Sequence, residues 1–374
     1  MIENNDHKMN FKNVYQNKKV LVTGNTGFKG TWLSTWLLEL GAEVYGISHD
    51  IPSNPSIFEE LKLSEKMIHF NTDIRDLKKM KEIINHIKPD FCFHLAAQAI
   101  VSESYIDPIG TLTTNVIGTA NILEALRLVN HPCTTIIITS DKVYDNVEWK
   151  WGYRESDHIG GKDPYSASKG GAEMVVKTYF RSFFSKPESN IKIAVGRAGN
   201  VIGGGDWADN RIVPDCMRAW SKNLPVTVRN PKAIRPWQHV LESVSGYLTL
   251  GEKLHFNEKL NGEPFNFGPA IHQTVSVFEL LEGLSKHWEF DSFVQKYDIN
   301  SQQDFKESFI LKLCSDKAAH DLKWKATLEY KEMVAFTSSW YKTFYSGEEM
   351  FDFTIKQIHE YGKLAIERAI PQDL

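Results

Sequence analysis

The chain has 374 residues, of which 42% are hydrophobic and 24% are charged. This balance is typical of a globular protein with a substantial core and excludes a largely disordered one. The formal net charge of -4 is spread without a long basic run, so nothing indicates binding to nucleic acid or to an anionic membrane. No apolar run approaches the roughly 18 residues of a membrane span, and the polar start lacks the apolar core of a signal peptide. We therefore expect a cytoplasmic protein.

The four cysteines lie far apart in the sequence. None occurs in a Cys-x-x-Cys motif, and none is spaced from a histidine in the way that metal ligands usually are. We therefore expect reduced thiols buried in the core, and no metal site, at Cys92, Cys133, Cys216 and Cys314.

After a polar arm at residues 1–16, short β-rich runs alternate with segments of helical periodicity. The runs begin with KKVLVTG and EVYGIS and continue to IKIAVGR, and helical stretches such as TWLSTWLLELG lie between them. This alternation is typical of βαβ units and a parallel sheet. The sequence predicts an α/β fold in which residues 17–198 form a Rossmann-type, doubly wound parallel sheet.

Residues 199–374 show a looser pattern, with GGGDWADN, several prolines and scattered aromatic residues. This composition favours a smaller C-terminal α/β domain that binds the substrate. A helical stretch and a strand-like FNFGP between residues 236 and 268 predict that the chain returns there to the first domain. The segment after Glu348 contains no motif that indicates a role.

The first β-rich run leads into TGNTGFKG, a glycine-rich turn before a helix. Glycine suits this turn because the backbone needs unusual φ angles, must approach a pyrophosphate, and must let the helix pack close to the strand. The free N–H groups of the helix then face the phosphates. Similar glycines occur in plain turns, so the prediction depends on their place in the first βαβ unit. The expected cofactor contacts are Gly24, Thr26, Gly27, Phe28 and Gly30.

The ends of the next three runs carry further candidate cofactor contacts. Asp50 lies where an acidic residue often holds the adenosine ribose hydroxyls, and the lack of Arg and Lys between residues 44 and 59 favours NAD over NADP. A solvated loop is the alternative role for Asp50. Asp73 would accept a hydrogen bond from the adenine amino group, with Ile74 packed nearby. The end of the fourth run places the small Ala96 and Ala97, with Leu95 before them, beside the cofactor.

Tyr165 and Lys169 lie four residues apart in YSASK, on one face of an expected helix, and Ser140 ends the fifth β-rich run. The Lys169 ammonium and a positively charged nicotinamide ring would lower the pKa of the tyrosine, so that it acts as a base near neutral pH. The serine hydroxyl would share the proton of the alcohol. A Tyr-x-x-x-Lys pair is common on exposed helices, but its combination with this serine and the glycine turn is much rarer.

These motifs resemble the extended short-chain dehydrogenases over residues 17–345, and among them the nucleotide-sugar 4,6-dehydratases. SDKVYDN, GRAGNVIGGGDWADNRIVPD and RPWQHV are similar to CDP-glucose 4,6-dehydratases, in which Asp-Lys follows the serine, whereas the dTDP-glucose enzymes have Asp-Glu. The resemblance implies NAD-dependent conversion of CDP-glucose to CDP-4-dehydro-6-deoxyglucose. Tyr165 would take the 4-hydroxyl proton with support from Ser140 and Lys169, and hydride would pass from C4 to NAD and return to C6.

By the same resemblance, Asp141 and Lys142 would assist loss of the C5 proton and of the 6-hydroxyl as water. Their division of roles stays open, because a lysine must be neutral to accept a proton and its ordinary pKa is about 10.4. A solvated pair in a turn is the alternative.

The substrate contacts also follow from the resemblance. Asn200 matches a family asparagine at the sugar diphosphate, and Asn115 matches a position near the cofactor. Arg211 and Arg235 are candidates for the diphosphate because guanidinium groups bind phosphate oxygens bidentately, with surface salt bridges as the alternative. GGGDW at 203–207 is expected to be a flexible loop that contacts the ligand or only covers it as a mobile lid. The remaining candidates for sugar or nucleotide contact are Gln98, Ser102, Tyr105, Asp206, Trp207 and His239.

Two other functions fit parts of this pattern. A sugar epimerase also oxidises C4 but needs no acid/base pair at C5 and C6, so Asp141 and Lys142 argue against it. A non-enzymatic NAD-binding protein often lacks the tyrosine or the lysine, and both are present. The resemblance further implies deoxysugar synthesis for surface polysaccharide such as lipopolysaccharide O-antigen. It also implies a homodimer, or a homotetramer, formed through the helices that follow Thr114 and contain Tyr165.

Overall fold

The computed structural model describes residues 9–270, 273, 275–290, 296–299 and 310–369. Its centre is a seven-stranded parallel sheet with the strand order β11-β6-β5-β4-β1-β2-β3. The order reverses between β1 and β4, which is the switch point of a doubly wound sheet. The predicted Rossmann-type fold is confirmed. The strands are β1 (Lys19–Thr23), β2 (Glu43–Ser48), β3 (Ile68–Asn71), β4 (Phe91–His94), β5 (Cys133–Ile138), β6 (Ile191–Ala198) and β11 (Pro264–Phe267).

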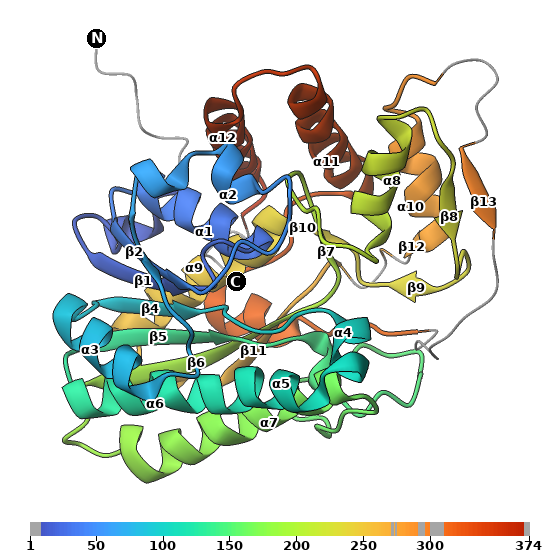
Figure 1. Cartoon of the computed structure of the whole chain (residues 1–374). Coiled ribbons are helices and arrows are strands. Elements are labelled where there is room, and N and C mark those ends of the chain that lie inside the picture. The colour runs from blue at the N-terminus through green and yellow to red at the C-terminus, as the bar shows by residue number, and fades with distance from the viewer. Residues whose placement is uncertain (1–8, 271–272, 274, 291–295, 300–309, 370–374) are drawn as a thin grey trace.

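Helices cover both faces of the sheet (Figure 1). All 6 residues of β5 are buried, as a parallel strand covered on both faces requires. One layer contains α3 (Leu77–Ile87), α6 (Gly118–Val129) and α7 (Pro164–Tyr179), and the other contains α1 (Phe28–Glu39) and α9 (Val240–Phe256). Short helical segments in the connections are α2 (Ile57–Glu60), α4 (Val101–Ile106), α5 (Pro108–Leu112) and a wide turn at Thr113–Ile117.

A smaller lobe lies to the right of the sheet in Figure 1 and is built from residues after β6. Its short strands pair with partners distant in sequence, as in the parallel pair of β7 with β10 and the antiparallel pair of β9 with β12. Its elements are β7 (Val201–Ile202), α8 (Ile212–Trp220), β8 (Val226–Val228), β9 (Ile234–Arg235), β10 (Gln238–His239), β12 (Val275–Ser276), α10 (Val277–Ser285) and β13 (Tyr297–Ile299).

The ends of the chain do not follow the predicted domain division. Residues 1–8 of the predicted polar arm lie outside the described residues, but Phe11, Val14 and Tyr15 are buried in the main core. The prediction that the arm extends to residue 16 is therefore wrong, because these side chains pack against the sheet layer: the Tyr15 hydroxyl donates to the carbonyl of Leu248 on α9 at 2.6 Å.

The C-terminal helices α11 (Tyr330–Tyr345) and α12 (Met350–Glu367) lie at the top of Figure 1. Residues 199–374 were expected to form mainly the substrate domain, yet α12 packs on α1 of the first domain. Trp36 contacts Tyr361 edge to face, and His359 Nε2 lies 2.6 Å from Glu39 Oε1. The C-terminus therefore covers the sheet layer as well as the smaller lobe.

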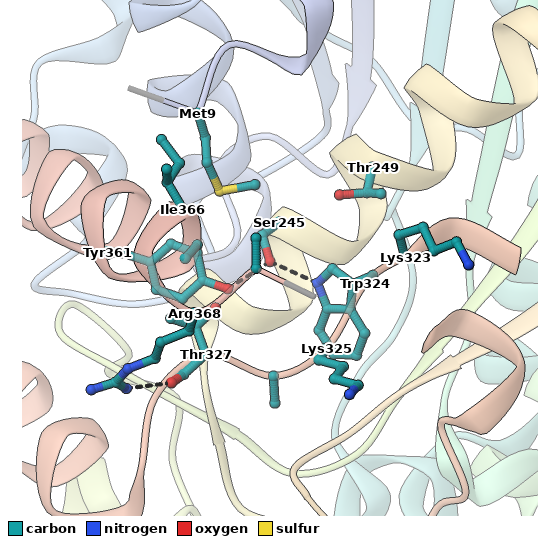
Figure 2. Close-up of a pocket in the computed structure, with 13 residues that line it drawn as sticks. Met9, Ser245, Thr249, Lys323, Trp324, Lys325, Thr327, Tyr361, Ile366 and Arg368 are labelled. Carbon is teal, nitrogen blue, oxygen red and sulfur yellow. Dashed lines mark hydrogen bonds between the residues drawn. The ribbon is translucent and has the colours of Figure 1, made fainter. Parts of the chain in front are cut away.

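A buried carboxyl group on α9 anchors the segment that leads to these helices. Glu242 accepts hydrogen bonds from the backbone N–H groups of Thr327 and Leu328 and from the Tyr361 hydroxyl. Burial raises the pKa of Glu242 to about 7. A cavity of about 180 Å³ lies beside this anchor, where Trp324 donates to Ser245 (Figure 2). Among the described residues, no helix is long and apolar enough to cross a membrane.

A buried ion pair fixes α7 to the sheet. Arg197 of β6 and Glu173 of α7 are 2% and 6% exposed, and Arg197 Nε donates to Glu173 Oε1 at 2.7 Å. The Thr139 hydroxyl donates to the same carboxylate at 2.6 Å, and Arg197 Nη1 donates to the Tyr144 hydroxyl at 2.7 Å. Every group in this network has a partner, which is the condition under which charges are tolerated in a core.

We predict that Glu173→Ala lowers the free energy of unfolding by about 3–5 kcal/mol, because it leaves the Arg197 guanidinium buried without its counter-charge. Urea unfolding at neutral pH measures this. The matched control is Glu124→Ala, which breaks the more exposed Glu124–Arg127 pair and should cost no more than about 1 kcal/mol. Equal losses in the two variants would contradict the structural role of the buried pair.

Candidate functional site

The predicted site residues gather at the carboxyl ends of β1, β4, β5 and β6, beside the switch point of the sheet. Open α/β sheets bind ligands at this edge because the strand ends and helix N-termini converge there. One side of the site is the glycine turn before α1, and the other is the loop between β7 and α8 in the smaller lobe. The catalytic candidates lie between them, on the turn after β5 and on α7.

The glycine turn adopts a conformation that only glycine tolerates well. Gly24 has φ +75°, and a Cβ there would lie 2.7 Å from the backbone nitrogen of Ala96. A Cβ on Gly30 would lie 2.0 Å from the Gly24 carbonyl oxygen, so α1 starts in direct contact with the turn. Gly27, the N-cap of α1, has more room, with only that oxygen at 3.3 Å. The Thr26 hydroxyl donates to the backbone carbonyl of Asp50 at 2.7 Å, which ties the turn to the end of β2.

Asp50 and Asp73 lie at neighbouring strand ends, as predicted, but their surroundings differ. The Asp50 carboxylate is 58% exposed beside His49. The Asp73 carboxylate accepts from Arg75 Nη2 at 2.6 Å, and this hydrogen bond lowers its pKa. A contact with adenine would therefore compete with Arg75. Ile74 is buried and packs toward Gly118 at the start of α6.

Asn115 holds the loop after β4 in place. It accepts from the backbone N–H of Gln98 at 2.8 Å and donates to the Gln98 carbonyl and to the Ser168 hydroxyl of α7. Asn115 is 2% exposed, so it braces the loop that contains Leu95, Ala96 and Ala97. The Gln98 side chain donates to the Ile100 carbonyl in the same loop and to the Thr111 hydroxyl on α5. Two further candidates follow on α4, the partly buried Ser102 and the 44% exposed Tyr105.

The five catalytic candidates come together. Ser140 caps the short turn after β5: its hydroxyl accepts from the backbone N–H of Lys142 at 3.2 Å and donates to Asp141 Oδ1 at 3.0 Å. Tyr165 and Lys169, one turn apart on α7, are 8% and 7% exposed. The Lys142 ammonium lies 5.9 Å from the centroid of the Tyr165 ring. The other oxygen of Asp141 is buried and has no partner among the described residues.

Burial dominates the protonation of these groups. It raises the pKa of Tyr165 to about 12, although a hydrogen bond with Ser140 acts in the opposite direction. The expectation that the lysine on α7 lowers this pKa is not met by the protein alone, because desolvation is the larger effect and the Asp141 charge adds to it. Burial also raises the pKa of Asp141, and burial with repulsion from Lys29 lowers that of Lys169 to about 7.

The loop at 203–207 is packed and buried, which contradicts the prediction of a flexible loop or lid. A Cβ on Gly204 would lie 2.0 Å from the Trp340 ring, so this glycine serves close packing. Trp207 is 3% exposed and packs against α11, with its ring centroid 4.7 Å from that of Phe344. Neither this tryptophan nor the fully buried His239, which contacts the rings of Trp32 and Phe336, presents a side chain to an open surface.

Polar groups of the smaller lobe interact with one another and with the turn after β5. Asp206 accepts from Arg211 Nη1 at 2.9 Å, and the Asp206 charge raises the pKa of the guanidinium. Arg235 is partly buried at the end of β9, where its charge acts on Asp141. The Asn200 carbonyl accepts from the Gln238 backbone N–H at 3.0 Å, which places Asn200 between β6 and the β7–β10 pair. Within the described part of the chain, no cluster of His, Cys, Asp and Glu could hold a metal ion.

Lys29 is a further charged residue of this site, and no sequence motif predicted it. Its charge acts on Asp141 and Lys169, and it is itself affected by Arg211 and Asp206. The only sequence signal is a charged residue inside the glycine motif, in the GFKG that opens α1. Its proximity to these four residues, which come from three other segments of the chain, is visible only in the fold.

The residues at the turn fit a dinucleotide. The backbone at the start of α1 is accessible because Gly24 and Gly27 have no side chain and Ala96 has a small one. The N–H groups there attract phosphate. Asp50 provides an exposed carboxylate at the end of β2, the usual place for a ribose contact.

A family model described as GDP-mannose 4,6 dehydratase matches residues 21–337. The chain belongs to this dehydratase family. A CDP-glucose 4,6-dehydratase of Salmonella typhimurium is 42% identical over 353 residues, which cover 94% of this chain and 98% of that relative. A CDP-paratose 2-epimerase of Salmonella typhi is 29% identical, covering 73% of this chain and 85% of the relative. The predicted family is confirmed.

Solved structures of more distant proteins share the fold. A UDP-glucose 4-epimerase from Thermotoga maritima has a TM-score of 0.75 at 22% identity and covers 87% of this chain and 99% of its own. A dTDP-glucose 4,6-dehydratase from Streptomyces venezuelae, solved with NAD, has a TM-score of 0.74 at 20% identity, with coverages of 89% and 99%. Dehydratases and epimerases therefore share this architecture, and the residues of the site must distinguish them.

We predict that Gly27→Ala weakens NAD binding at least about tenfold and changes the melting temperature little, because its Cβ meets only the Gly24 carbonyl oxygen at 3.3 Å and would add bulk to the turn expected to hold the phosphates. Gly30→Ala is the comparison: its Cβ overlaps the Gly24 carbonyl, so it should lower the melting temperature as well. Calorimetric titration with NAD and thermal unfolding measure the two effects. Wild-type affinity in Gly27→Ala would show that the dinucleotide does not lie over this turn.

Proposed function

We propose that the protein catalyses NAD-dependent dehydration of CDP-glucose to CDP-4-dehydro-6-deoxyglucose. The observation that carries this proposal is the buried cluster of Ser140, Asp141, Tyr165 and Lys169 with Lys142 beside it, which joins groups for alcohol oxidation to groups for water loss. The 42% identity to a CDP-glucose 4,6-dehydratase supports the choice of the cytidine nucleotide. The glycine turn and Asp50 support NAD as the cofactor.

Tyr165 is the base that takes the proton of the sugar 4-hydroxyl. When bound, NAD supplies reversible storage for the hydride that leaves C4 and returns to C6, and its positive ring favours the tyrosinate. That contribution offsets the burial that holds the pKa of Tyr165 at about 12. Ser140, which hydrogen-bonds with Tyr165, shares the proton, and Lys169 lies one turn along α7 on the same face.

Asp141 and Lys142 act after a ketone has formed at C4 and has made the C5 proton acidic. Burial raises the pKa of Asp141, so this carboxyl favours the protonated form needed to release the 6-hydroxyl as water. Its other oxygen is buried without a hydrogen-bond partner among the described residues. Lys142, over the Tyr165 ring, assists at C5, from which a proton leaves with the loss of water and to which a proton returns when hydride reaches C6. A C4-epimerase would have no use for this pair, which favours dehydration over epimerisation.

The smaller lobe binds the nucleotide sugar in this proposal. Arg211 and Arg235 provide positive charge for the diphosphate, and Asn200 and Asp206 lie beside them. We place the reaction in the cytoplasm and its product in deoxysugar synthesis for surface polysaccharide such as lipopolysaccharide O-antigen.

The test uses CDP-glucose with deuterium at C4, incubated with the protein and NAD and followed by mass spectrometry and NMR. We expect a product that has lost water and carries deuterium at C6, because the hydride removed from C4 is returned within the same active site. Turnover of only dTDP-, UDP- or GDP-glucose would keep the mechanism and overturn the nucleotide assignment. Epimerised sugar without loss of water would overturn dehydration itself.

Two variants separate the steps in the same assay. Tyr165→Phe removes the base and should lower the turnover rate by about 10²–10⁴-fold while NAD still binds. Asp141→Asn keeps the size of the side chain but removes the acid, so oxidation at C4 should proceed and reduced nicotinamide should accumulate at 340 nm.

We also propose that the protein is a homodimer whose subunits meet on α7 and on the helical stretch from α5 to α6. These neighbouring helices carry apolar side chains on the surface: Ile109 is 70% exposed, Ile117 51% and Met174 54%. Exposed apolar groups on adjacent helices suit contact with a second copy of the chain, because a two-fold axis brings the same surface of both subunits together.

We predict that Ile109→Lys with Ile117→Lys yields monomers, because the charges would be buried in the interface. Sedimentation velocity measures the mass in solution. Ile68→Lys is the control: this isoleucine is 49% exposed on the edge strand β3 and should leave the oligomer intact. A wild-type chain that sediments as a monomer would contradict the proposed dimer.

A further inference from the structure

Lys29 is a charged residue at the centre of the site that the proposed reaction does not use. It lies in the first turn of α1, and its side chain is only partly exposed. No group among the described residues accepts a hydrogen bond from its ammonium. A partly buried lysine whose ammonium has no hydrogen-bond partner within the protein indicates that its partner is a ligand.

The first turn of α1 is fixed against the smaller lobe. Trp32 Nε1 donates to the Gly204 carbonyl at 3.0 Å, and the Phe28 ring borders Gly203, with an atom 3.3 Å from where a Cβ would lie. Phe28 and Trp32 are four residues apart and face the loop at 203–207 together. Lys29, next to Phe28, is therefore held at the boundary between the glycine turn and the loop that leads to Arg211.

The charges around Lys29 leave positive charge in excess. The charge of Lys29 is repelled by Arg211 and by Lys169. The acidic groups that attract it are Asp141 and Asp206. Asp206 is already paired with Arg211 at 2.9 Å. Burial and the charge of Arg211 lower the pKa of Lys29 to about 8, and the opposing effect of Asp141 and Asp206 is smaller.

We propose that Lys29 is a substrate-binding residue whose ammonium, together with the Arg211 guanidinium, holds the diphosphate of the nucleotide sugar. The assignment rests on the proposed function. A diphosphate suits two neighbouring cations, because the lysine ammonium can bind one oxygen as a compact charge and the guanidinium can bind two oxygens at once. The cofactor also carries a diphosphate, but the backbone N–H groups at the start of α1 serve that one. The substrate diphosphate is favoured because Asp206 and Arg211 lie on the substrate side.

The experiment measures binding and does not require turnover. Lys29→Met keeps the length and removes the charge, and Lys29→Arg keeps the charge. Calorimetric titration of each variant with CDP in the presence of NAD, and with NAD alone, gives two dissociation constants. We expect Lys29→Met to weaken CDP about 10- to 100-fold and NAD less than about threefold, and Lys29→Arg to recover most of the loss. Lys79→Met, an exposed lysine on α3, controls for net charge and should bind CDP normally.

Each other outcome overturns the assignment. Weakened NAD binding with unchanged CDP binding would show that Lys29 binds the cofactor and not the substrate. Unchanged binding of both would show that Lys29 contacts neither ligand. Thermal unfolding shows that the variants are folded, and Lys29→Arg provides the test if Lys29→Met is not.

The proposed nucleotide can fail independently. If the wild-type protein does not bind CDP, the cytidine assignment is wrong, and the same variants are titrated with dTDP, UDP and GDP. The role of Lys29 is then tested by the affinity of the variants for the nucleoside diphosphate that the wild type binds. Binding of none of the four would overturn both proposals.

Discussion

Glu173 and Arg197 are opposite charges in a region without water, and neither is tolerable there without the other. The helix α7 must approach the end of β5 closely, because Tyr165 has to reach Ser140. Apolar contacts alone give such a helix little directional restraint, whereas the charged hydrogen bonds to Glu173 fix both its rotation and its position along the sheet. The geometry of the proposed catalytic groups therefore depends on a pair to which the proposal gives no part in the chemistry.

Exclusion of water also sets the protonation of the site. It raises the pKa of Tyr165 and Asp141 and lowers that of Lys169, and in each case burial is the largest cause. A carboxyl group poised to keep its proton suits release of a hydroxyl as water, while a tyrosine with a high pKa needs positive charge before it can act as a base. In the proposed reaction the positively charged nicotinamide ring supplies this charge.

The loop at 203–207 shows how the same residues can indicate opposite properties. A run of three glycines with Asp-Trp predicts mobility when the sequence is considered alone. In the fold, a Cβ on Gly204 or Gly205 would lie 2.0 or 2.5 Å from the side chain of Trp340 or Ile57, so these glycines permit close packing. The partners lie more than a hundred residues away in either direction along the chain, and local pattern carries no information about them.

The sequence by itself determined the alternation of strands and helices, the glycine turn and the Ser140, Tyr165 and Lys169 set. These features are local, because each depends on periodicity or on residues a few positions apart. The longer strings identified the family. Only the tertiary structure decided that residues 11–15 and α12 belong to the core, that Asn115 braces a loop, and that Lys29 faces the catalytic groups. Burial and electrostatic contact between distant segments depend on how the whole chain packs, and no short stretch of sequence encodes them.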